Sequence, residues 1–349
     1  MKRTRRILRI AIPILAIITT LIFAPLEALW IWATPLPDTV KEQVDQAMGH
    51  SLDGMMVYVD KKGRPPEFYA SGWKNRENKV PADPHALFKI ASISKLYIAT
   101  AAAKLVSSKK LTLDKTLADY LPELAGGIEN ANQITLRMLL QHRSGIPNFI
   151  DDPRFPWAKS SVSTREALNL IIGKPADFKP GSRYRYSNTN YLLIGNIIDK
   201  TLGYSHRQYI KTEILDPLGL KHTYGLLSEA DSGAVVSGYI TGYNEDVRAL
   251  DFIIPGGSMV ATAQDVGVFL RALNDGSLLN HDEQTIYSSV YPYEHTGLLP
   301  GYSSIARYYK DMDTVVILFV NTSGGNTWTT LETVYNRIVR ILHKQVLKQ

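Results

Sequence analysis

A serine and a lysine three residues apart, Ser92 and Lys95, are the first candidates for chemistry in this chain. Residues three apart on a helix share a face, with their Cβ atoms about 5–6 Å from each other. A serine hydroxyl becomes an effective nucleophile when a base takes its proton, and a lysine is such a base when burial and nearby positive charge lower its pKa. A helix that begins near Ser92 therefore predicts a nucleophile beside a base, at a positively polarised helix N-terminus.

Two other serine-lysine pairs have the same spacing, at residues 71–74 and 107–110, so the spacing alone is weak. The first ends a strand-like run and contains a glycine, which indicates a turn, and the second lies at the polar end of a helix. Only the pair formed by Ser92 and Lys95 opens an apolar helical run, which continues to residue 106. We therefore take this pair as the reactive one.

Tyr186 and Asn188 form a second group, in a loop just before an apolar helical run that ends at Gly203. A tyrosine close to a lysine ammonium can titrate low enough to move protons, and an asparagine amide can orient a substrate carbonyl. Taken alone, Tyr186 is one of 19 tyrosines and Asn188 suits a helix cap equally well. The functional interpretation depends on Ser92.

His295, Thr296 and Gly297 form a third group, before a predicted hairpin. A strand edge here supplies His295 and Thr296 as donors that face a substrate, and Gly297 lets the backbone approach a ligand closely. A lone histidine is more often structural. The chain has no His-Glu-x-x-His spacing for a metal and no Gly-x-Ser-x-Gly nucleophile elbow.

The composition is that of a globular protein, with 45% hydrophobic and 21% charged residues. The net charge of +6 is concentrated at the N-terminus, where residues 1–34 hold five basic residues and one acidic residue. The remainder carries only about +2, so nucleic-acid binding is not expected. The absence of cysteine excludes disulfides, thiol catalysis and cysteine zinc sites.

Residues 1–34 are predicted to direct the chain to a membrane, because a basic stretch precedes an apolar run over residues 10–24. Continuing the run to Trp32 gives a spanning length with aromatic residues at its end, although Glu27 interrupts it. No small-x-small cleavage site follows Ala24, which favours an uncleaved signal anchor over a cleaved signal peptide. The basic flank predicts that the body, residues 35–349, lies outside the cytoplasm, and it is secreted if the segment is cleaved.

The order of elements predicts an α+β fold: strands early, helices in the middle, strands late and a final helix. An antiparallel sheet built from both chain ends and flanked by helices follows, with a helical subdomain inserted at about residues 110–250. The expected strands are 55–60, 67–71, 302–309 and 314–321. The expected helices are 35–49, one from Ser92, 136–142, 165–172, 188–202, 209–215, 263–273 and 328–347.

Taken together, the three groups of residues resemble the motifs of the penicillin-recognising serine hydrolases, which include Ser-x-x-Lys and Lys-Thr-Gly. The resemblance is to the branch that contains class C β-lactamases, D-alanyl-D-alanine carboxypeptidases and related esterases. That branch uses Tyr-x-Asn as its second motif and often has phrases like those at residues 139–145, 180–181 and 255–257. The likeness spans roughly residues 38–345 and implies a β-lactamase/transpeptidase-like fold.

The resemblance implies a role for each matching residue. Ser92 is the acyl-accepting nucleophile, Lys95 and Tyr186 transfer protons, and Asn188 is a substrate ligand. The third motif, residues 295–297, also faces the substrate. The backbone N–H groups of Ser92 and Leu298 form the oxyanion hole, and neither a metal nor an organic cofactor is needed.

One residue departs from the common pattern, because His295 stands where many members have lysine. A permanently charged lysine suits a substrate carboxylate, whereas a histidine is charged only in part near neutral pH. Some D,D-peptidases of the branch that this chain resembles also carry His-Thr-Gly, so the change weakens the β-lactamase interpretation more than the peptidase one. It also leaves an esterase open. The interval from Gly276 to His295 is also short, which predicts a more open or altered cleft on that side.

We therefore expect a cell-wall D-alanyl hydrolase, either a D,D-carboxypeptidase or a D-alanyl esterase. The alternatives are a class C-like β-lactamase, a general carboxylesterase and, in another class, a non-catalytic penicillin-binding-like sensor or scaffold. The expected partners are a small acyl substrate, which is a D-alanyl peptide, a D-alanyl ester or a β-lactam, and a membrane bound through residues 10–32. The sequence does not fix the oligomeric state.

Overall fold

The computed structural model describes residues 9, 11–15, 19, 26–159 and 161–347. Residues 10, 16–18 and 20–25 of the predicted membrane segment lie outside these ranges. Among the residues that are described, no helix combines the length and apolar character that crossing a bilayer requires. The membrane segment over residues 10–32 and the division of the chain at residues 34 and 35 stay predictions.

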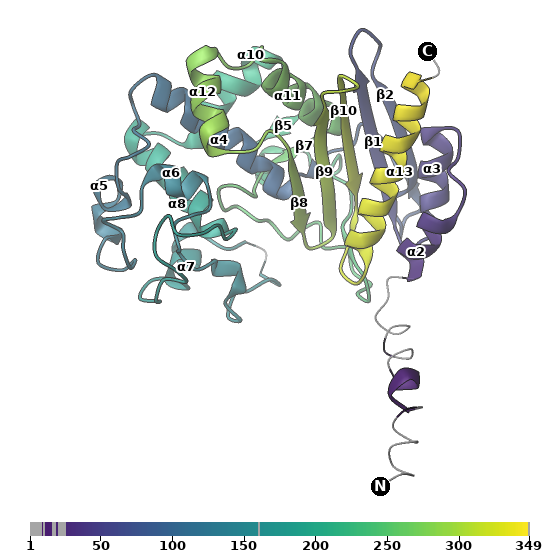
Figure 1. The fold of residues 1–349 in the computed structure, drawn as a ribbon, viewed down its shortest axis with the longest axis horizontal. Helices are drawn as coiled ribbons and strands as arrows, with labels where there is room; N and C mark the ends of the chain where they lie inside the picture. The colour runs from purple at the N-terminus through teal and green to yellow at the C-terminus, as the bar shows by residue number, and fades with distance from the viewer. Residues whose placement is uncertain (1–8, 10, 16–18, 20–25, 160, 348–349) are drawn as a thin grey trace.

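An antiparallel sheet assembled from both ends of the chain forms the centre of the body (Figure 1). This confirms the predicted α+β architecture, in which early and late strands share one sheet. The contact between the two chain ends is the pairing of β1 with β10, in which Met55 lies opposite Val320. In spatial order the strands are β3 (Val80–Pro81), β2 (Glu67–Asn75), β1 (Gly54–Lys61), β10 (Thr314–Val320), β9 (Tyr302–Tyr309) and β8 (His295–Leu299).

Helices cover both faces of this sheet (Figure 1). Alternate residues of a strand point to opposite faces, so the two central strands need apolar residues at successive positions. The side chains of Met55, Val57 and Val59 pack under one helical layer, and those of Met56 and Tyr58 pack under the other. The first layer holds α2 (Leu26–Ala33), α3 (Val40–Ala47) and α13 (Thr327–Leu347), and the second holds α4 (Ser94–Ser107), α11 (Ala263–Asp275) and α12 (His281–Val290).

The middle of the chain supplies most of the remaining helices. Two short strands of this part of the chain pair with strands of the body. The strand β5 (Thr223–Tyr224) pairs with β7 (Val260–Ala261), and β6 (Tyr239–Ile240) pairs with β11 (Thr322–Ser323). The predicted helical subdomain at 110–250 therefore holds strands as well near its C-terminal end. The helices are α5 (Leu117–Tyr120), α6 (Leu136–Leu140), α7 (Thr164–Asn169), α8 (Asn188–Leu202), α9 (His206–Ile210) and α10 (Asp216–Leu218), and the short strands are β4 (Phe88–Lys89), β5 (Thr223–Tyr224), β6 (Tyr239–Ile240), β7 (Val260–Ala261) and β11 (Thr322–Ser323).

Helix caps explain where several helices begin. Thr39 and Ser163 each accept a hydrogen bond from the backbone N–H of the residue three positions later, Glu42 and Glu166 respectively. The carboxylates of these glutamates bond back to the backbone N–H groups of the caps. The predicted helix over residues 35–49 is therefore shorter, because it begins after the Thr39 cap. The helix α12 was not predicted, although its Asn280 cap has the same capping-box geometry. This helix packs on α4 and occupies the interval for which we expected an open cleft.

A buried arginine on α13 holds α2 and the segment after it against the body. Its guanidinium donates to the backbone oxygens of Ile31 at 2.7 Å, Thr34 at 2.9 Å and Pro35 at 2.8 Å, and to the side-chain oxygen of Gln43 at 2.5 Å. This residue, Arg337, is only 2% exposed. It satisfies carbonyl oxygens at the C-terminal end of α2 that the helix itself leaves free.

Replacing this arginine should destabilise the body. We expect Arg337→Met to lower the free energy of unfolding by about 2–4 kcal/mol, because several buried oxygens lose their donors. Arg340→Met, on an exposed position of the same helix, is the matched control and should change it by less than about 0.5 kcal/mol. Urea unfolding followed by circular dichroism measures both, and equal effects of the two changes would contradict a capping role.

Candidate functional site

Ser92 lies in a tight 3₁₀ turn, η1 (Ala91–Ile93), that leads directly into α4. The preceding residue, Ala91, has a φ of 51°, in the left-handed region that non-glycine residues rarely adopt. The side chain of Ser94 holds this turn, since its hydroxyl donates to the oxygen of Ala91 at 2.6 Å and accepts from the N–H of Met259 at 3.2 Å. Strained backbone of this kind persists where its surroundings fix it, and is common at active sites.

Lys95 is completely buried, and its amine makes three polar contacts. The Nζ atom lies 3.1 Å from Ser92 Oγ, 2.9 Å from Asn188 Oδ1 and 2.7 Å from the backbone oxygen of Gly256. A neutral amine donates two N–H bonds to the last two oxygens, which accept only. Its lone pair then points to the remaining contact, the Ser92 hydroxyl.

Burial lowers the pKa of Lys95 to about 7. Desolvation penalises the charged ammonium more than the neutral amine, and no carboxylate is among the three groups that its Nζ contacts. A substantial fraction of the lysine is therefore neutral near pH 7. The amine has both the position and the protonation state of a general base for Ser92.

Tyr186 lies on the other side of the nucleophile, with its hydroxyl 2.8 Å from Ser92 Oγ. Burial raises its pKa well above the ordinary tyrosine value, although the bond to Ser92 acts in the opposite direction. The expectation that a nearby lysine ammonium lowers this pKa is wrong. Lys95 Nζ lies 5.2 Å from the centre of the tyrosine ring, and it is itself partly neutral. The phenol is therefore protonated and donates a hydrogen bond.

Asn188 is the first residue of α8, and a second asparagine fixes the orientation of its amide. Asn148 Oδ1 accepts from the backbone N–H of Asn188 at 2.9 Å and from its Nδ2 at 3.3 Å. The amide nitrogen of Asn188 therefore faces Asn148, and its oxygen faces Lys95. Sequence analysis did not identify Asn148, because 40 residues separate it from its partner and no local pattern marks it.

Sequence analysis assigned no role to His142, although this residue lies in the stretch 139–145, which resembles a motif of the penicillin-recognising hydrolases. Its ring packs against that of Tyr186 with the centroids 4.5 Å apart. Its Nδ1 accepts from the backbone N–H of Ser187 at 3.2 Å, which requires the proton to be on Nε2. Burial lowers the pKa of His142 to about 3, so the imidazole is neutral. The ring thus supports Tyr186 and the start of α8.

The strand β8 forms the opposite wall and carries the third motif. Its glycine, Gly297, is required by the body itself, because a Cβ there would lie 2.5 Å from the oxygen of Ile90 and 3.1 Å from the Cβ of Ala91. The absence of a side chain lets β8 approach the turn that holds the nucleophile. Thr296 and Leu298, on either side, line the same cavity as Ser92.

His295 is uncharged in this setting. Its Nδ1 donates to the backbone oxygen of Thr296, so its Nε2 carries no proton. The ring lies 6.2 Å from that of Tyr186 and 5.9 Å from that of Tyr291, measured between centroids. Burial between these rings, with a smaller effect of Lys95, lowers the pKa of His295 to about 4. Our expectation of a partly charged histidine near neutral pH is therefore wrong.

A cavity of about 740 Å³ holds the nucleophile together with Tyr186, Asn188 and the third motif. The described residues that line it include no lysine, arginine, aspartate or glutamate. Most of the remaining lining is apolar. The remaining lining residues are Ala91, Ile150, Trp157, Ile240, Phe252, Gly257, Leu298, Leu299, Pro300, Ser323 and Gly324.

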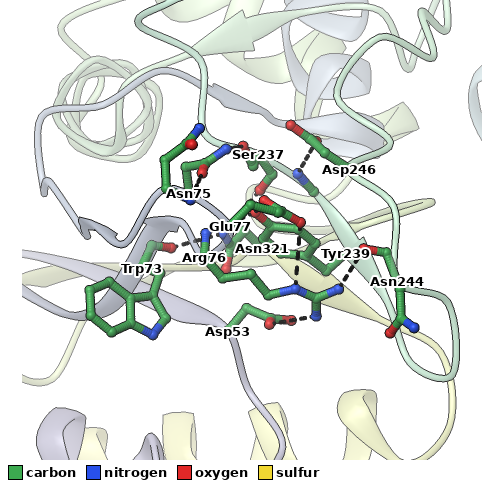
Figure 2. A network of polar contacts seen from close by, with 12 residues as sticks. Asp53, Trp73, Asn75, Arg76, Glu77, Ser237, Tyr239, Asn244, Asp246 and Asn321 are labelled. Atoms are coloured by element: carbon green, nitrogen blue, oxygen red, sulfur yellow. Dashed lines mark hydrogen bonds and ion pairs between the residues drawn. The ribbon is translucent and has the colours of Figure 1, made fainter.

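A network of polar contacts fixes the segment that carries Ile240 (Figure 2). The Arg76 guanidinium lies 4.0 Å from the centre of the Tyr239 ring and binds Asp53 Oδ1 at 2.9 Å. Asn321 Nδ2 donates to the oxygen of Ser237 at 2.9 Å. These contacts join the segment around β6 to the start of β1 and the end of β10, and so hold one wall of the cavity.

The structure thus gathers Ser92, Lys95, Tyr186 and Asn188 into one hydrogen-bonded group and sets the third motif across the cavity. The assignment of the Ser92 and Leu298 N–H groups as an oxyanion hole stays a prediction, and both residues line this cavity. Among the described residues no three histidine, aspartate or glutamate side chains cluster as metal ligands would. The expectation that no cofactor is needed stays a prediction as well.

The sequence of this chain is similar to a family model and to several known proteins. The family model described as Beta-lactamase matches residues 40–291. The chain is 30% identical over 194 residues to Protein flp of Staphylococcus aureus, covering 54% of this chain and 39% of that protein. It is 26% identical over 295 residues to the putative penicillin-binding protein PbpX of Bacillus subtilis, covering 78% of this chain and 71% of that protein. This chain thus spans well under half the length of Protein flp.

Among solved structures, the chain is similar to D-amino acid amidase from Ochrobactrum anthropi. The TM-score is 0.77 with 23% identity, over 88% of this chain and 98% of the amidase. At this identity the likeness concerns the fold. It agrees with the predicted β-lactamase/transpeptidase-like arrangement.

Removing the lysine amine should slow acylation of Ser92 without unfolding the protein. We expect Lys95→Met to reduce the acylation rate by about 10²–10⁴-fold, the usual contribution of a general base. The matched control is Lys110→Met, in one of the other serine-lysine spacings, which should leave the rate unchanged. Labelling with a fluorophosphonate probe measures the rate, and near-normal labelling of Lys95→Met would contradict the role.

Acylation should also depend on pH through this lysine. The rate should rise with pH and level off above a midpoint near 7, because the amine accepts a proton only when it is neutral. His142 and His295, with pKa values of about 3 and 4, do not titrate in this range. Pre-steady-state acylation by an uncharged ester measures the profile. A rise that continues toward pH 10 would mean that Lys95 has an ordinary pKa.

Proposed function

The chain belongs to the Beta-lactamase family, and from this membership we propose that it is a serine hydrolase that forms a covalent acyl-enzyme on Ser92. One observation carries the proposal. The Ser92 hydroxyl lies within hydrogen-bonding distance of both Lys95 Nζ, at 3.1 Å, and Tyr186 Oη, at 2.8 Å. A hydroxyl nucleophile in contact with a neutral amine, which can act as the base, and a protonated phenol, which can act as the acid, can carry out acyl transfer.

In the first half of the reaction, the neutral amine of Lys95 takes the proton of Ser92, and the serine oxygen attacks the substrate carbonyl. The N–H groups of Ser92 and Leu298 stabilise the negative oxygen of the tetrahedral intermediate. Tyr186 donates its proton to the leaving group, and the proton that Lys95 took from Ser92 then passes to the Tyr186 oxygen, so that both groups regain their starting protonation states. An alcohol or amine leaves, and the acyl group remains on Ser92.

In the second half, water replaces the leaving group. The pair formed by the amine and the phenol takes one proton from the attacking water and gives one proton to the departing serine oxygen. Both groups therefore end in their starting protonation states. The products are a carboxylic acid and free Ser92. Asn188, whose amide is oriented by Asn148, holds the Lys95 amine in place throughout.

We propose a cell-wall D-alanyl compound as the substrate, and an ester or amide ahead of a peptide with a free C-terminal carboxylate. The described lining of the cavity has no cationic side chain, and the pKa of His295 is lowered to about 4. A substrate carboxylate would therefore be desolvated there without a partner, which is costly. The similarity to a protein named D-amino acid amidase supports an acyl donor without that carboxylate.

A panel of four substrates tests this proposal on purified full-length protein: D-alanine methyl ester, D-alaninamide, an acyl-D-alanyl-D-alanine peptide and a chromogenic cephalosporin. We expect the ester or the amide to have a kcat/KM at least about 100-fold above that of the peptide, because the carboxylate of the peptide would be desolvated in the cavity without a charged partner. Ser92→Ala, with no turnover, is the control. Turnover of the cephalosporin alone would favour the β-lactamase alternative, and no acylation by any compound would favour a non-catalytic protein.

The charge of the side chain at position 295 should set the preference for the ester or amide over the peptide. We expect His295→Lys to raise kcat/KM for the peptide relative to the ester by about 10-fold or more, because the ammonium pairs with the carboxylate. His295→Gln, which keeps the position uncharged, is the matched control and should leave the ratio near its original value. An unchanged ratio in His295→Lys would mean that the carboxylate does not lie near this side chain.

A further inference from the structure

The chain has five tryptophans, and the elements that carry them lie at or beside one end of the large sheet (Figure 1). Trp30 and Trp32 are on α2, Trp73 is near the end of β2, Trp157 lines the cavity and Trp328 is in the first turn of α13. Four of them are unusually exposed, by 67%, 70%, 40% and 43% in that order. Single exposed tryptophans scattered over a surface are ordinary, whereas exposed tryptophans gathered at one end of a folded body indicate an interaction surface.

The strand directions define this end. Because the large sheet is antiparallel, β2, β8 and β10 end where β1 and β9 begin. The helix α2 lies beside this end, and the C-terminus of α13 lies at the other (Figure 1). The opposite end has the turns at residues 62–66 and 310–313, which carry lysine and arginine and no tryptophan. The two ends of the sheet therefore differ in chemistry.

The helix α2 is fixed to the body rather than free. Its Ala28 and Ile31 are buried, and Arg337 binds the backbone oxygen of Ile31. The carboxylate of Glu27 accepts a hydrogen bond from the Ser51 hydroxyl at 2.7 Å. The one acidic residue that interrupts the apolar N-terminal segment thus faces the body, and Trp30 and Trp32 are left on the exposed side.

The occupant of this exposed face is indicated by the chain that precedes it. Residues 10–24 form an apolar run after a basic stretch, and they lead within two residues into α2. Tryptophan is enriched where protein meets the headgroup layer of a bilayer, because its ring is amphipathic. We propose that this end of the molecule rests on the outer surface of a lipid bilayer, with the exposed tryptophans in the headgroup layer.

The cavity that holds Ser92 is built at the same end, and this part of the proposal rests on the proposed function. Its lining includes Trp157, Pro300 in the turn between β8 and β9, and Ser323 and Gly324 just after β10. Asp53, just before β1, donates its N–H to Thr322 Oγ1 at 2.9 Å. The acyl compounds that reach Ser92 are therefore those displayed at the lipid surface, held at a height set by α2.

Depth-dependent quenching tests the orientation. Full-length protein is reconstituted in phosphatidylcholine and phosphatidylglycerol vesicles that contain brominated lipid, using variants in which one tryptophan is kept and the others are phenylalanine. We expect the four exposed tryptophans, Trp30, Trp32, Trp73 and Trp157, to be quenched. A tryptophan placed at the opposite end, as Lys310→Trp in the tryptophan-free chain, should not be quenched. Quenching of this control, or no quenching of Trp73, would overturn the orientation.

Turnover tests the consequence for substrate choice. We compare soluble D-alanine methyl ester with a D-alanyl ester on the headgroup of phosphatidylglycerol in the same vesicles. A flexible Gly-Ser insertion after Ala33 should lower turnover of the lipid-borne ester by about 10-fold, because the height of the cavity above the lipid surface is then no longer fixed. It should leave turnover of the soluble ester unchanged. Equal effects on both esters would overturn the inference. No turnover of either ester by the unmodified chain would instead count against the proposed function, while the quenching result would still stand.

Discussion

Burial of the Lys95 amine is the constraint on which the site depends. An ammonium in this position would need compensation for its lost hydration, and its three contacts are all to oxygens of neutral groups. The amine therefore loses its proton near pH 7, and a residue that is an acid on the surface becomes a base inside. A base for Ser92, the proposed nucleophile, is therefore available without a histidine.

Several parts of the fold must agree for that burial to occur. The helix α4 is enclosed by other elements along most of its length, so its first turn is held inside the body. From α8 comes the Asn188 oxygen, and from the loop before β7 comes that of Gly256. The close approach of β8, which Gly297 permits, then closes the cavity beside Ser92. The strained turn at Ala91 is fixed by the same packing.

The same dry surroundings determine what the cavity can recognise. Low polarity keeps Tyr186 protonated and His295 neutral, so the walls offer hydrogen bonds and apolar surface rather than charge. This combination suits a carbonyl flanked by uncharged groups. A histidine at this position also differs from a lysine because its ordinary pKa is much lower, so the same burial leaves the imidazole neutral near pH 7.

Much of the fold could be predicted from local sequence patterns. The strands at 302–309 and 314–321 were recognisable because they are rich in β-branched and aromatic residues, and the final helix because it is amphipathic. The starts of the helices capped by Thr135, Ser163 and Thr262 were recognisable. The starts after Thr39 and Thr116 were missed, and so was α12, although Asn280 and Glu283 have the capping-box spacing. The pairing of β5 and β6 with the body was not predictable, because two-residue strands have no periodicity.

The sequence by itself identified the candidate site residues, since Ser92 and Lys95 have the spacing of neighbours on one helix and the other motifs follow in a recognisable order. The tertiary structure alone decided their protonation. The pKa values of Lys95, Tyr186 and His295 depend on how deeply each group is buried and on which groups surround it. Those surroundings come from residues such as Asn148 and His142, which lie far away in the sequence and meet the site only after folding.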